Sequence, residues 1–400
     1  MKFQKFVQEN KTFPVFVLVG TVLLFAGLFI DFYSMHMLIF ISIFLIILYG
    51  LGVFYERHVD DYLTFTFAEV PNRHYQGDEG YIEVEIEQKG ILPLLNAEVV
   101  IEMDDVIEFK GGRSIARRYM TTFNKNFNLM FWEKRKIRIP YETKKRGVAK
   151  VQNIELVVPN IFGFSKVFMK ARKRFNKEVI VYPNKSVVPN IDLMSPKNMG
   201  FHRATHSLFD EHTLPVGTRD YEQGDAFNKI HWKASAKEGA LQTKVFEKAS
   251  QISWCFLLNV RSDQGLSVAE NVETLLEQIA YMTEYATKNQ IPYRIFVNIS
   301  ALDQIPFIHQ LEGEGHFHYR KTLELLARMK FLTFNTPYER VLHFVWKHES
   351  TPAYVIQVGS VTDRQMQYLK LIERKGAKLA FLNGDSLTAG PSEGKVRQSG

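Results

Sequence analysis

Side chains that are able to do chemistry gather in one stretch of the chain, residues 213–248. The stretch combines a cation, two carboxylates, an imidazole and a hydroxyl, in the side chains of Arg219, Asp220, Asp225, His231 and Ser235. In an enzyme such groups serve as charge partner, general base and nucleophile. No glycine-rich phosphate loop, zinc-type His/Cys spacing or nucleophile elbow accompanies them. The pattern therefore favours a buried polar network or a docking surface over catalysis, with Arg219 paired to Asp220 or Asp225.

A short helix and a strand are expected to position these groups. Asp225 is a suitable N-cap for a helix that ends near Gly239. Trp232 is then expected to pack the joint between the helix and a sheet. Residues 241–246 alternate between two faces, which is typical of a strand. The segment is predicted to form a turn, a short helix, a turn and a strand.

The run R-D-Y-x-x-G-D-x-x-x-x-I-H-W-K-A-S-A, followed by a Lys-x-Phe-Glu strand, resembles the signature of the bacterial domain-of-unknown-function 58 family. The residues that carry the resemblance are Arg219, Asp220, Tyr221, Gly224, Asp225, His231, Trp232, Lys233, Ser235 and Lys244. The resemblance implies a membrane-anchored protein with a von Willebrand factor A-like domain. It also implies a MoxR-type AAA ATPase as a protein partner, since members are often encoded beside one.

Two runs free of Asp, Glu, Lys and Arg, residues 13–30 and 35–55, predict two transmembrane helices within residues 1–57. As one helix the whole stretch would be about 64 Å long, roughly twice the hydrocarbon thickness of a bilayer. The chain is therefore expected to turn back at residues 31–34, where Asp31 supplies a polar break. These features predict a membrane hairpin of two helices.

The charges that flank these runs predict an orientation. Lys2, Lys5 and Lys11 precede the first run, Arg57 follows the second, and the connecting loop holds only Asp31. Because basic residues are retained on the cytoplasmic side, both termini are expected there. The predicted localisation is a multi-pass protein of the cell membrane.

Residues 58–180 show mostly two-residue alternation broken by turn residues, which favours an antiparallel β-sandwich. Residues 56–109 hold fourteen acidic and three basic side chains, whereas residues 110–177 hold nineteen basic and three acidic ones. One interpretation is that three basic clusters near the membrane, residues 134–136, 144–146 and 172–174, bind anionic lipid headgroups. The other is that acidic and basic strands pair across the sandwich. No nucleic-acid-binding motif accompanies the charge, so nucleic acid is not expected as a partner.

The remainder of the chain is predicted to hold a second domain. Residues 181–212 are expected to form a connector, and residues 213–383 an α/β domain that includes the signature. Apolar runs alternate there with segments of helical spacing, among them residues 363–374, which predicts a largely parallel sheet. Residues 384–400 are expected to be a disordered tail. With the resemblance, this order predicts a von Willebrand A-like domain.

A metal site would lie beyond the end of the first strand of such a sheet. The candidate stretch holds Asn259 and Asp263, separated by Arg261. Asn259 stands where a carboxylate is expected, and the charge of Arg261 repels a cation. These two residues are therefore weak metal candidates, and no cofactor is expected.

The single cysteine, Cys255, lies in an apolar run and is expected to be a buried structural thiol. Together these features predict a membrane-anchored, non-enzymatic adaptor that presents its second domain to a protein partner. The alternative is a membrane-associated enzyme acting on a phosphorylated or lipid-linked substrate through Arg219, Asp225 and His231.

Overall fold

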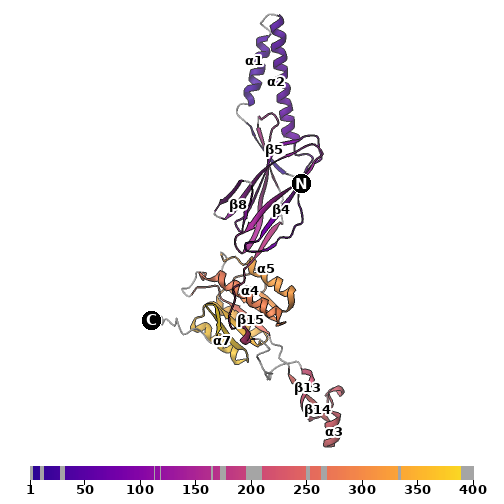
Figure 1. The fold of residues 1–400 in the computed structure, drawn as a ribbon, viewed down its shortest axis with the longest axis vertical. Coiled ribbons are helices and arrows are strands. Elements are labelled where there is room, and N and C mark those ends of the chain that lie inside the picture. Colours follow the sequence, from indigo (N-terminus) through magenta and orange to yellow (C-terminus); the bar gives the residue numbers. More distant parts are fainter. Residues whose placement is uncertain are drawn as a thin grey trace, which may run out of the picture. The chain divides into compact units, whose positions relative to one another are not determined.

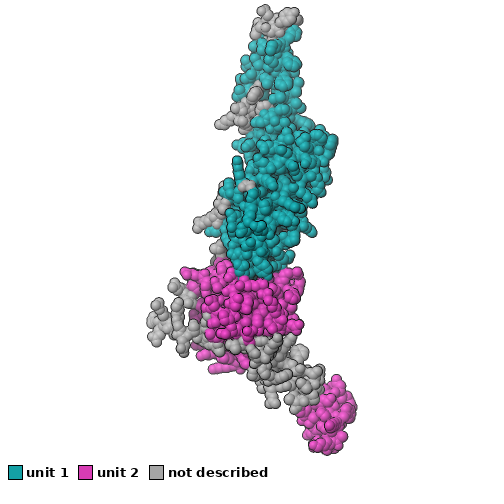
Figure 2. All heavy atoms as spheres, viewed as in Figure 1, with its two compact units in different colours: residues 1–184, 324–329 teal, residues 185–323, 330–400 magenta. Residues whose placement is uncertain are grey.

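A computed structural model describes most of the chain, in these ranges: 3–9, 13–27, 32–111, 113–117, 119–163, 165–171, 177–194, 210–248, 253–262, 268–331 and 335–388. It divides into two compact units, coloured separately in Figure 2. The first unit holds residues 1–184 and 324–329, and the second holds residues 185–323 and 330–400.

Two helices stand near the N-terminus of the first unit (Figure 1). They are α1 (Phe13–Gly27) and α2 (Phe32–His58). The hydroxyl of Ser42 in α2 donates a hydrogen bond of 2.5 Å to the carbonyl oxygen of Gly20 in α1. The two helices approach closely at Gly20, because an added Cβ at this glycine would lie 3.7 Å from Leu45.

The prediction of two transmembrane helices is wrong. In the described part of the chain only His36–His58 of α2 has the length and apolar character needed to cross a membrane. The apolar part of α1 is confined to Val17–Ala26, and all fifteen residues of α1 span only about 22 Å. The multi-pass localisation is therefore wrong as well.

The predicted orientation placed both termini in the cytoplasm and required two crossings of the membrane. Since the prediction of two crossings is wrong, this orientation has no basis. Lys5 is also no free flanking cation, because it lies in strand β1 (Phe3–Glu9), donates to the carbonyl of Arg57 at 2.7 Å and pairs with Asp60. Lys2, Lys11 and Asp31 lie outside the described residues.

The rest of the first unit is built from two β-sheets. One has the order β1, β11 (Ser165–Ala171), β10 (Gly147–Pro159), β5 (Leu94–Asp104), β8 (Met120–Leu129) and β7 (Arg113–Arg117), and β12 (Glu178–Tyr182) and β3 (Arg73–Tyr75) extend it from β10. The other has the order β2 (Leu63–Phe67), β4 (Glu79–Gln88), β9 (Lys134–Thr143) and β6 (Ile107–Phe109). All pairings are antiparallel except that of β12 with β3.

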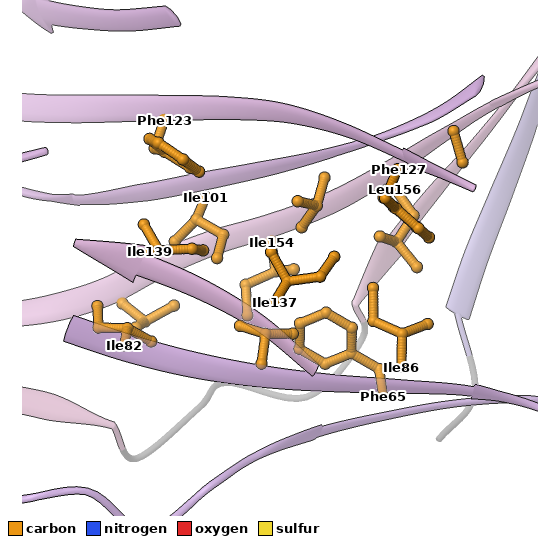
Figure 3. Close-up of a cluster of buried hydrophobic side chains, with 14 of the residues drawn as sticks. Phe65, Ile82, Ile86, Ile101, Phe123, Phe127, Ile137, Ile139, Ile154 and Leu156 are labelled. Carbon is orange, nitrogen blue, oxygen red and sulfur yellow. The ribbon is translucent and has the colours of Figure 1, made fainter. Parts of the chain in front are cut away.

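The inner faces of the two sheets form one apolar core (Figure 3). Ile82 and Ile86 of β4 and Ile139 of β9 lie opposite Ile101 of β5 and Ile154 of β10. All five side chains are buried, because the alternation of a strand puts every second residue on the same face. Burying each such side chain contributes about 1.5–3 kcal/mol to stability.

The second unit contains a six-stranded sheet with the order β17 (Ile308–Gly313), β16 (Tyr293–Val297), β15 (Trp254–Leu258), β18 (Tyr354–Val358), β19 (Lys378–Asn383) and β20 (Ser386–Thr388). Its helices are α4 (Val272–Lys288), α5 (Gly315–Arg328), α6 (Tyr338–His348) and α7 (Asp363–Arg374). Strands β15, β16 and β18 are buried at every position, as expected for strands covered on both faces.

The predicted fold class is wrong in two of its parts, the two-helix membrane hairpin before the antiparallel β-sandwich and the largely parallel von Willebrand A-like domain after it. The described residues hold seven α-helices and mostly antiparallel sheets, and the six-stranded sheet is mixed. Its edge strands β17 and β20 run antiparallel to β16 and β19. The connections are too short for the crossover that a parallel partner requires, because β19 reaches β20 through residues 384–385 alone.

Two further boundaries differ from the expected ones. The predicted connector, residues 181–212, includes the end of β12, the short 3-10 helix η1 (Ile191–Met194) and the first residues of a further strand. Residues 386–388 of the predicted tail form β20 and pair with β19. Residues 195–209 and 389–400 lie outside the described residues.

We expect Gly359→Ala to destabilise the α/β domain. Gly359 has a φ of +89°, and an added Cβ would lie 2.2 Å from the carbonyl oxygen of Asn259. Gly376 is a matched control, since its φ is +109° but a Cβ added there would meet no atom within 4 Å. The clash should lower stability by at least about 1 kcal/mol beyond the control. Equal melting temperatures for the two alanine variants in calorimetry would contradict this expectation.

Candidate functional site

The sequence signature forms a two-stranded element, residues 210–248, called the signature hairpin below. Its strands are β13 (Asp210–Asp220) and β14 (Gln242–Lys248), paired antiparallel with Arg219 opposite Thr243 and Asp220 opposite Gln242. Between them lie the 3-10 helix η3 (Phe227–Lys229) and α3 (Trp232–Glu238). Figure 1 shows α3 at the turn end of the two strands.

The carboxylate of Asp225 accepts three hydrogen bonds within the signature hairpin. Its Oδ1 accepts from Nη2 of Arg219 at 2.6 Å. Its Oδ2 accepts from the backbone N–H of Glu222 at 3.1 Å and from the hydroxyl of Thr243 at 3.0 Å. The Arg219 guanidinium, the Glu222 amide and the Thr243 hydroxyl hold the pKa of the Asp225 carboxyl below its ordinary value, and Asp225 raises that of Arg219 in return.

A second carboxylate, that of Asp220, links the two strands of the hairpin. The side-chain amide of Gln242 donates to Oδ1 of Asp220 at 2.6 Å. One residue further, the backbone N–H of Tyr221 donates to the carbonyl of Leu241 at 2.9 Å. Gly224 takes a φ of +116° in the turn before Asp225, a conformation that glycine adopts without strain.

His231, not Asp225, caps the helix. Nδ1 of His231 accepts from the N–H of Ala234 at 3.1 Å, and Gly239, which has a φ of +69°, is the C-cap of α3. The predicted end of the helix is therefore confirmed and the predicted start is wrong. The physical reason is that Asp225 is already satisfied by Arg219 and Thr243, and the chain between Asp225 and His231 forms a 3-10 turn.

The hydroxyl of Ser235 also serves the backbone. It donates to the carbonyl of His231 at 3.1 Å and accepts from the N–H of Gln242 at 2.8 Å. Within residues 210–248, no hydrogen bond joins this hydroxyl to the His231 ring. A catalytic nucleophile and its base require such a hydrogen bond. The two hydrogen bonds of the Ser235 hydroxyl thus join α3 to β14.

Two large aromatic residues of the signature hairpin lie on its surface. Trp232 is 62% exposed and Phe227 is 73% exposed. The expectation that Trp232 packs the joint between helix and sheet is therefore wrong, and Ile230 occupies that buried position instead. Of the two signature lysines, Lys233 is exposed on α3 and Lys244 is half-buried in β14.

Sequence reasoning missed Gln242 and Thr243 as members of the network. Both are buried polar residues of β14, and each meets a carboxylate. Their signal was present in the sequence, since an amide and a hydroxyl begin an otherwise charged and apolar strand. Only the register of β13 against β14 shows which carboxylate each one meets.

The weak metal candidate Asn259 lies at the end of β15 in a network of amides. Its Oδ1 accepts from Nδ2 of Asn298 at 2.7 Å and from the N–H of Arg261 at 3.2 Å, and its Nδ2 donates to the carbonyl of Ser360 at 2.8 Å. These contacts occupy the amide of Asn259 within the protein. Asp263, the other candidate, lies outside the described residues.

Burial raises the pKa of the Cys255 thiol to about 12. The thiolate is therefore scarcely populated at neutral pH, and the expectation of a buried structural thiol is confirmed.

The basic clusters of the β-sandwich are paired with its acidic strands. Arg138 contacts Glu83 at 2.8 Å and Lys136 contacts the same carboxylate at 3.3 Å, between the neighbouring strands β9 and β4. In the second cluster, Lys144 pairs with Glu108 at 2.9 Å. These pairs match the second interpretation of the charge partition. The cluster 172–174 lies outside the described residues.

Comparisons with known proteins add little. No family model and no curated protein sequence matches the chain. Among solved structures, a type I cohesin from Pseudobacteroides cellulosolvens is similar at a TM-score of 0.21 and 10% identity, over 30% of this chain and 92% of that one. A non-cellulosomal cohesin from Archaeoglobus fulgidus has a TM-score of 0.19 and 13% identity, over 26% and 82%.

A β-glucosidase from Listeria innocua has a TM-score of 0.18 and 13% identity, over 30% of this chain. This chain covers only 16% of the β-glucosidase. Scores this low give no grounds for assigning a fold or a function.

We expect the Asp225 carboxyl to titrate below its ordinary pKa of 3.8. A depressed pKa means that its contribution to the stability of the hairpin is complete above the ordinary value and is lost as the pH falls through the lower, folded value. Carbon-13 NMR of the carboxyl measures this pKa directly.

Two variants at Thr243 test the cause of the depressed pKa. Thr243→Val removes the hydroxyl and should raise the pKa of Asp225, whereas Thr243→Ser keeps the donor and should leave the pKa near that of the unaltered chain. A pKa that does not differ between the two variants would show that the hydroxyl has no part in it.

Proposed function

We propose that the protein is a membrane-anchored, non-enzymatic adaptor whose signature hairpin binds a protein partner. The observation that supports this function best is that the polar and the aromatic side chains of the hairpin have different surroundings. The polar groups of Asp225, His231 and Ser235 bond to the hairpin itself, while Phe227 and Trp232 lie exposed. Catalysis needs the opposite arrangement, with polar groups directed at a substrate.

Large exposed aromatic residues are suited to protein binding. Aromatic side chains carry much of the energy at interfaces because they bury a large area when a partner covers them. Phe227 begins η3 and Trp232 begins α3, so both stand on elements that the hydrogen bonds of Asp225 and His231 hold in place. A surface that is already ordered loses less conformational entropy on binding.

The anchor in this proposal is helix α2. Apolar side chains on its outer part are exposed, among them Met37, Phe40 and Phe44. An apolar helical surface of this kind is stable in lipid and unfavourable in water. Helix α2 is long enough for this role, because about 20 apolar residues match the thickness of the hydrocarbon core.

The resemblance of the signature to the domain-of-unknown-function 58 family suggests the class of partner. Members of that family are often encoded beside MoxR-type AAA ATPases. The proposed partner is therefore an ATPase of this type, and the proposed role is its recruitment to the membrane.

We expect the double variant Phe227→Ser, Trp232→Ser to lose affinity for the purified MoxR-type ATPase of the same cells. The loss of one aromatic hot spot costs about 2 kcal/mol, which corresponds to roughly 30-fold in Kd. Surface plasmon resonance on the detergent-solubilised full chain measures this change.

Leu302→Ser is the matched control. Leu302 is a fully exposed apolar residue that lies outside the signature hairpin. A folded double variant that binds as tightly as the control would refute the docking surface. A full chain that binds no such ATPase would refute the proposed partner.

A further inference from the structure

Three loops lie at the end of the β-sandwich that adjoins the last turns of α2. They connect β4 to β5 (residues 89–93), β8 to β9 (residues 130–133) and β10 to β11 (residues 160–164), and their described residues are called the loop collar below. Figure 1 shows α2 rising from one end of the β-sandwich.

Hydrogen bonds place two of these loops against the helix. The side-chain amide of Asn160 donates to the carbonyl of Gly52 at 3.1 Å and to the carboxylate of Glu56 at 2.7 Å. One turn later, the hydroxyl of Tyr55 donates to the carbonyl of Pro93 at 2.7 Å. The folded domain therefore begins to enclose α2 at Gly52.

The loop between β8 and β9 is attached to the loop between β4 and β5. The backbone N–H of Trp132 donates to the carbonyl of Gly90 at 3.4 Å. Tyr62, which follows α2, also lies against Gly90, with a ring carbon 3.1 Å from the position of an added Cβ. Two of the loops and Tyr62 thus meet at Gly90, whereas the loop between β10 and β11 contacts the helix through Asn160.

Each loop of the collar presents a large apolar side chain to its surroundings. Ile91 is 66% exposed, Trp132 is 69% exposed and Ile161 is 42% exposed. Phe131, beside Trp132, is also exposed and meets its ring edge-on at 5.6 Å. Trp132 keeps a bulky side chain at a φ of +54°, where glycine would be free of strain.

A cavity of about 390 Å³ opens between α2 and the first loop. Its apolar lining includes Phe54 and Ile91, and its polar lining includes His58 and Asp61, whose side chains contact each other at 2.7 Å. The helix end therefore passes from apolar to polar surroundings within about one turn. This change is what the boundary between hydrocarbon and lipid headgroups requires.

The length of α2 places the loop collar at that boundary. Twenty residues, Phe32 to Leu51, precede the first enclosed residue. At about 1.5 Å per residue they span about 30 Å, which equals the hydrocarbon thickness of a typical bilayer. A helix that crosses the bilayer with these residues brings the collar to the membrane surface. Trp and Tyr side chains are favoured at this depth, because their rings are apolar and their N–H or O–H groups are hydrated.

We propose that the loop collar is a membrane-binding surface that seats the β-sandwich in the interfacial layer of the bilayer through Ile91, Trp132 and Ile161. This inference rests on the proposed anchoring by α2 and deepens it. The lipid contact is apolar and interfacial, and the paired basic clusters on β9 take no part in it. The collar fixes the depth of the domain, whereas the helix alone fixes only its attachment.

The test uses the full chain reconstituted into phosphatidylcholine vesicles, with and without phosphatidylcholine brominated near the glycerol backbone. Bromine quenches tryptophan emission on contact. The quenching due to Trp132 is the difference between the unaltered chain and the folded variant Trp132→Phe. Trp232→Phe is the matched control, since Trp232 is similarly exposed but lies on the signature hairpin.

If the loop collar lies in the interfacial layer, brominated lipid is expected to quench the emission of Trp132 and to leave the emission of Trp232 unchanged. Vesicle flotation of the chain is measured first. A chain that floats but shows no quenching of Trp132, or equal quenching of both residues, overturns the loop collar and leaves the anchor standing. A chain that does not float overturns the anchor and the collar together.

Discussion

A buried carboxylate joins the apolar helix to the folded part of the first unit. Glu56 is buried near the end of α2, and its carboxylate accepts hydrogen bonds from Asn160 and Ser165 of the sandwich. A buried carboxyl group without hydrogen-bond partners is unfavourable, and Asn160 and Ser165 supply these partners. Tyr55 and Val59 extend the joint as part of the apolar core of the sandwich. Both the proposed anchor and the proposed loop collar depend on this joint, because it makes α2 continuous with the domain.

The signature hairpin has the opposite distribution of side chains from an active site. Its carboxylate, imidazole and hydroxyl groups form hydrogen bonds within the hairpin. Ile230 is buried there. Phe227 and Trp232 lie on the surface, and the proposed docking role rests on their exposure.

Elements with strong local signals were predictable. The sequence predicts a helix over residues 363–374, and α7 occurs there, because its capping box of Thr362 and Gln365 and its apolar spacing act within a few residues. The prediction failed where distant groups compete. Asp225 has the chemistry of an N-cap, but Arg219 and Thr243 reach it across the hairpin, and His231 takes over the cap. Likewise, segments 308–313 and 386–388 carry weak strand patterns, and they become strands because neighbouring strands offer their backbone groups as partners.

The sequence alone determined the apolar character of the residues that form α2, the alternation of the β-sandwich strands, the charge partition between residues 56–109 and 110–177, and the composition of the signature. Each of these is a property of residue types and their spacing. Only the tertiary structure decided that, among the described helices, α2 alone is long and apolar enough to cross a bilayer, that the acidic and basic strands pair, and that Trp232 and Trp132 lie exposed. These outcomes depend on which segments meet in space, and contacts between residues far apart in the chain leave no periodic signal in the sequence.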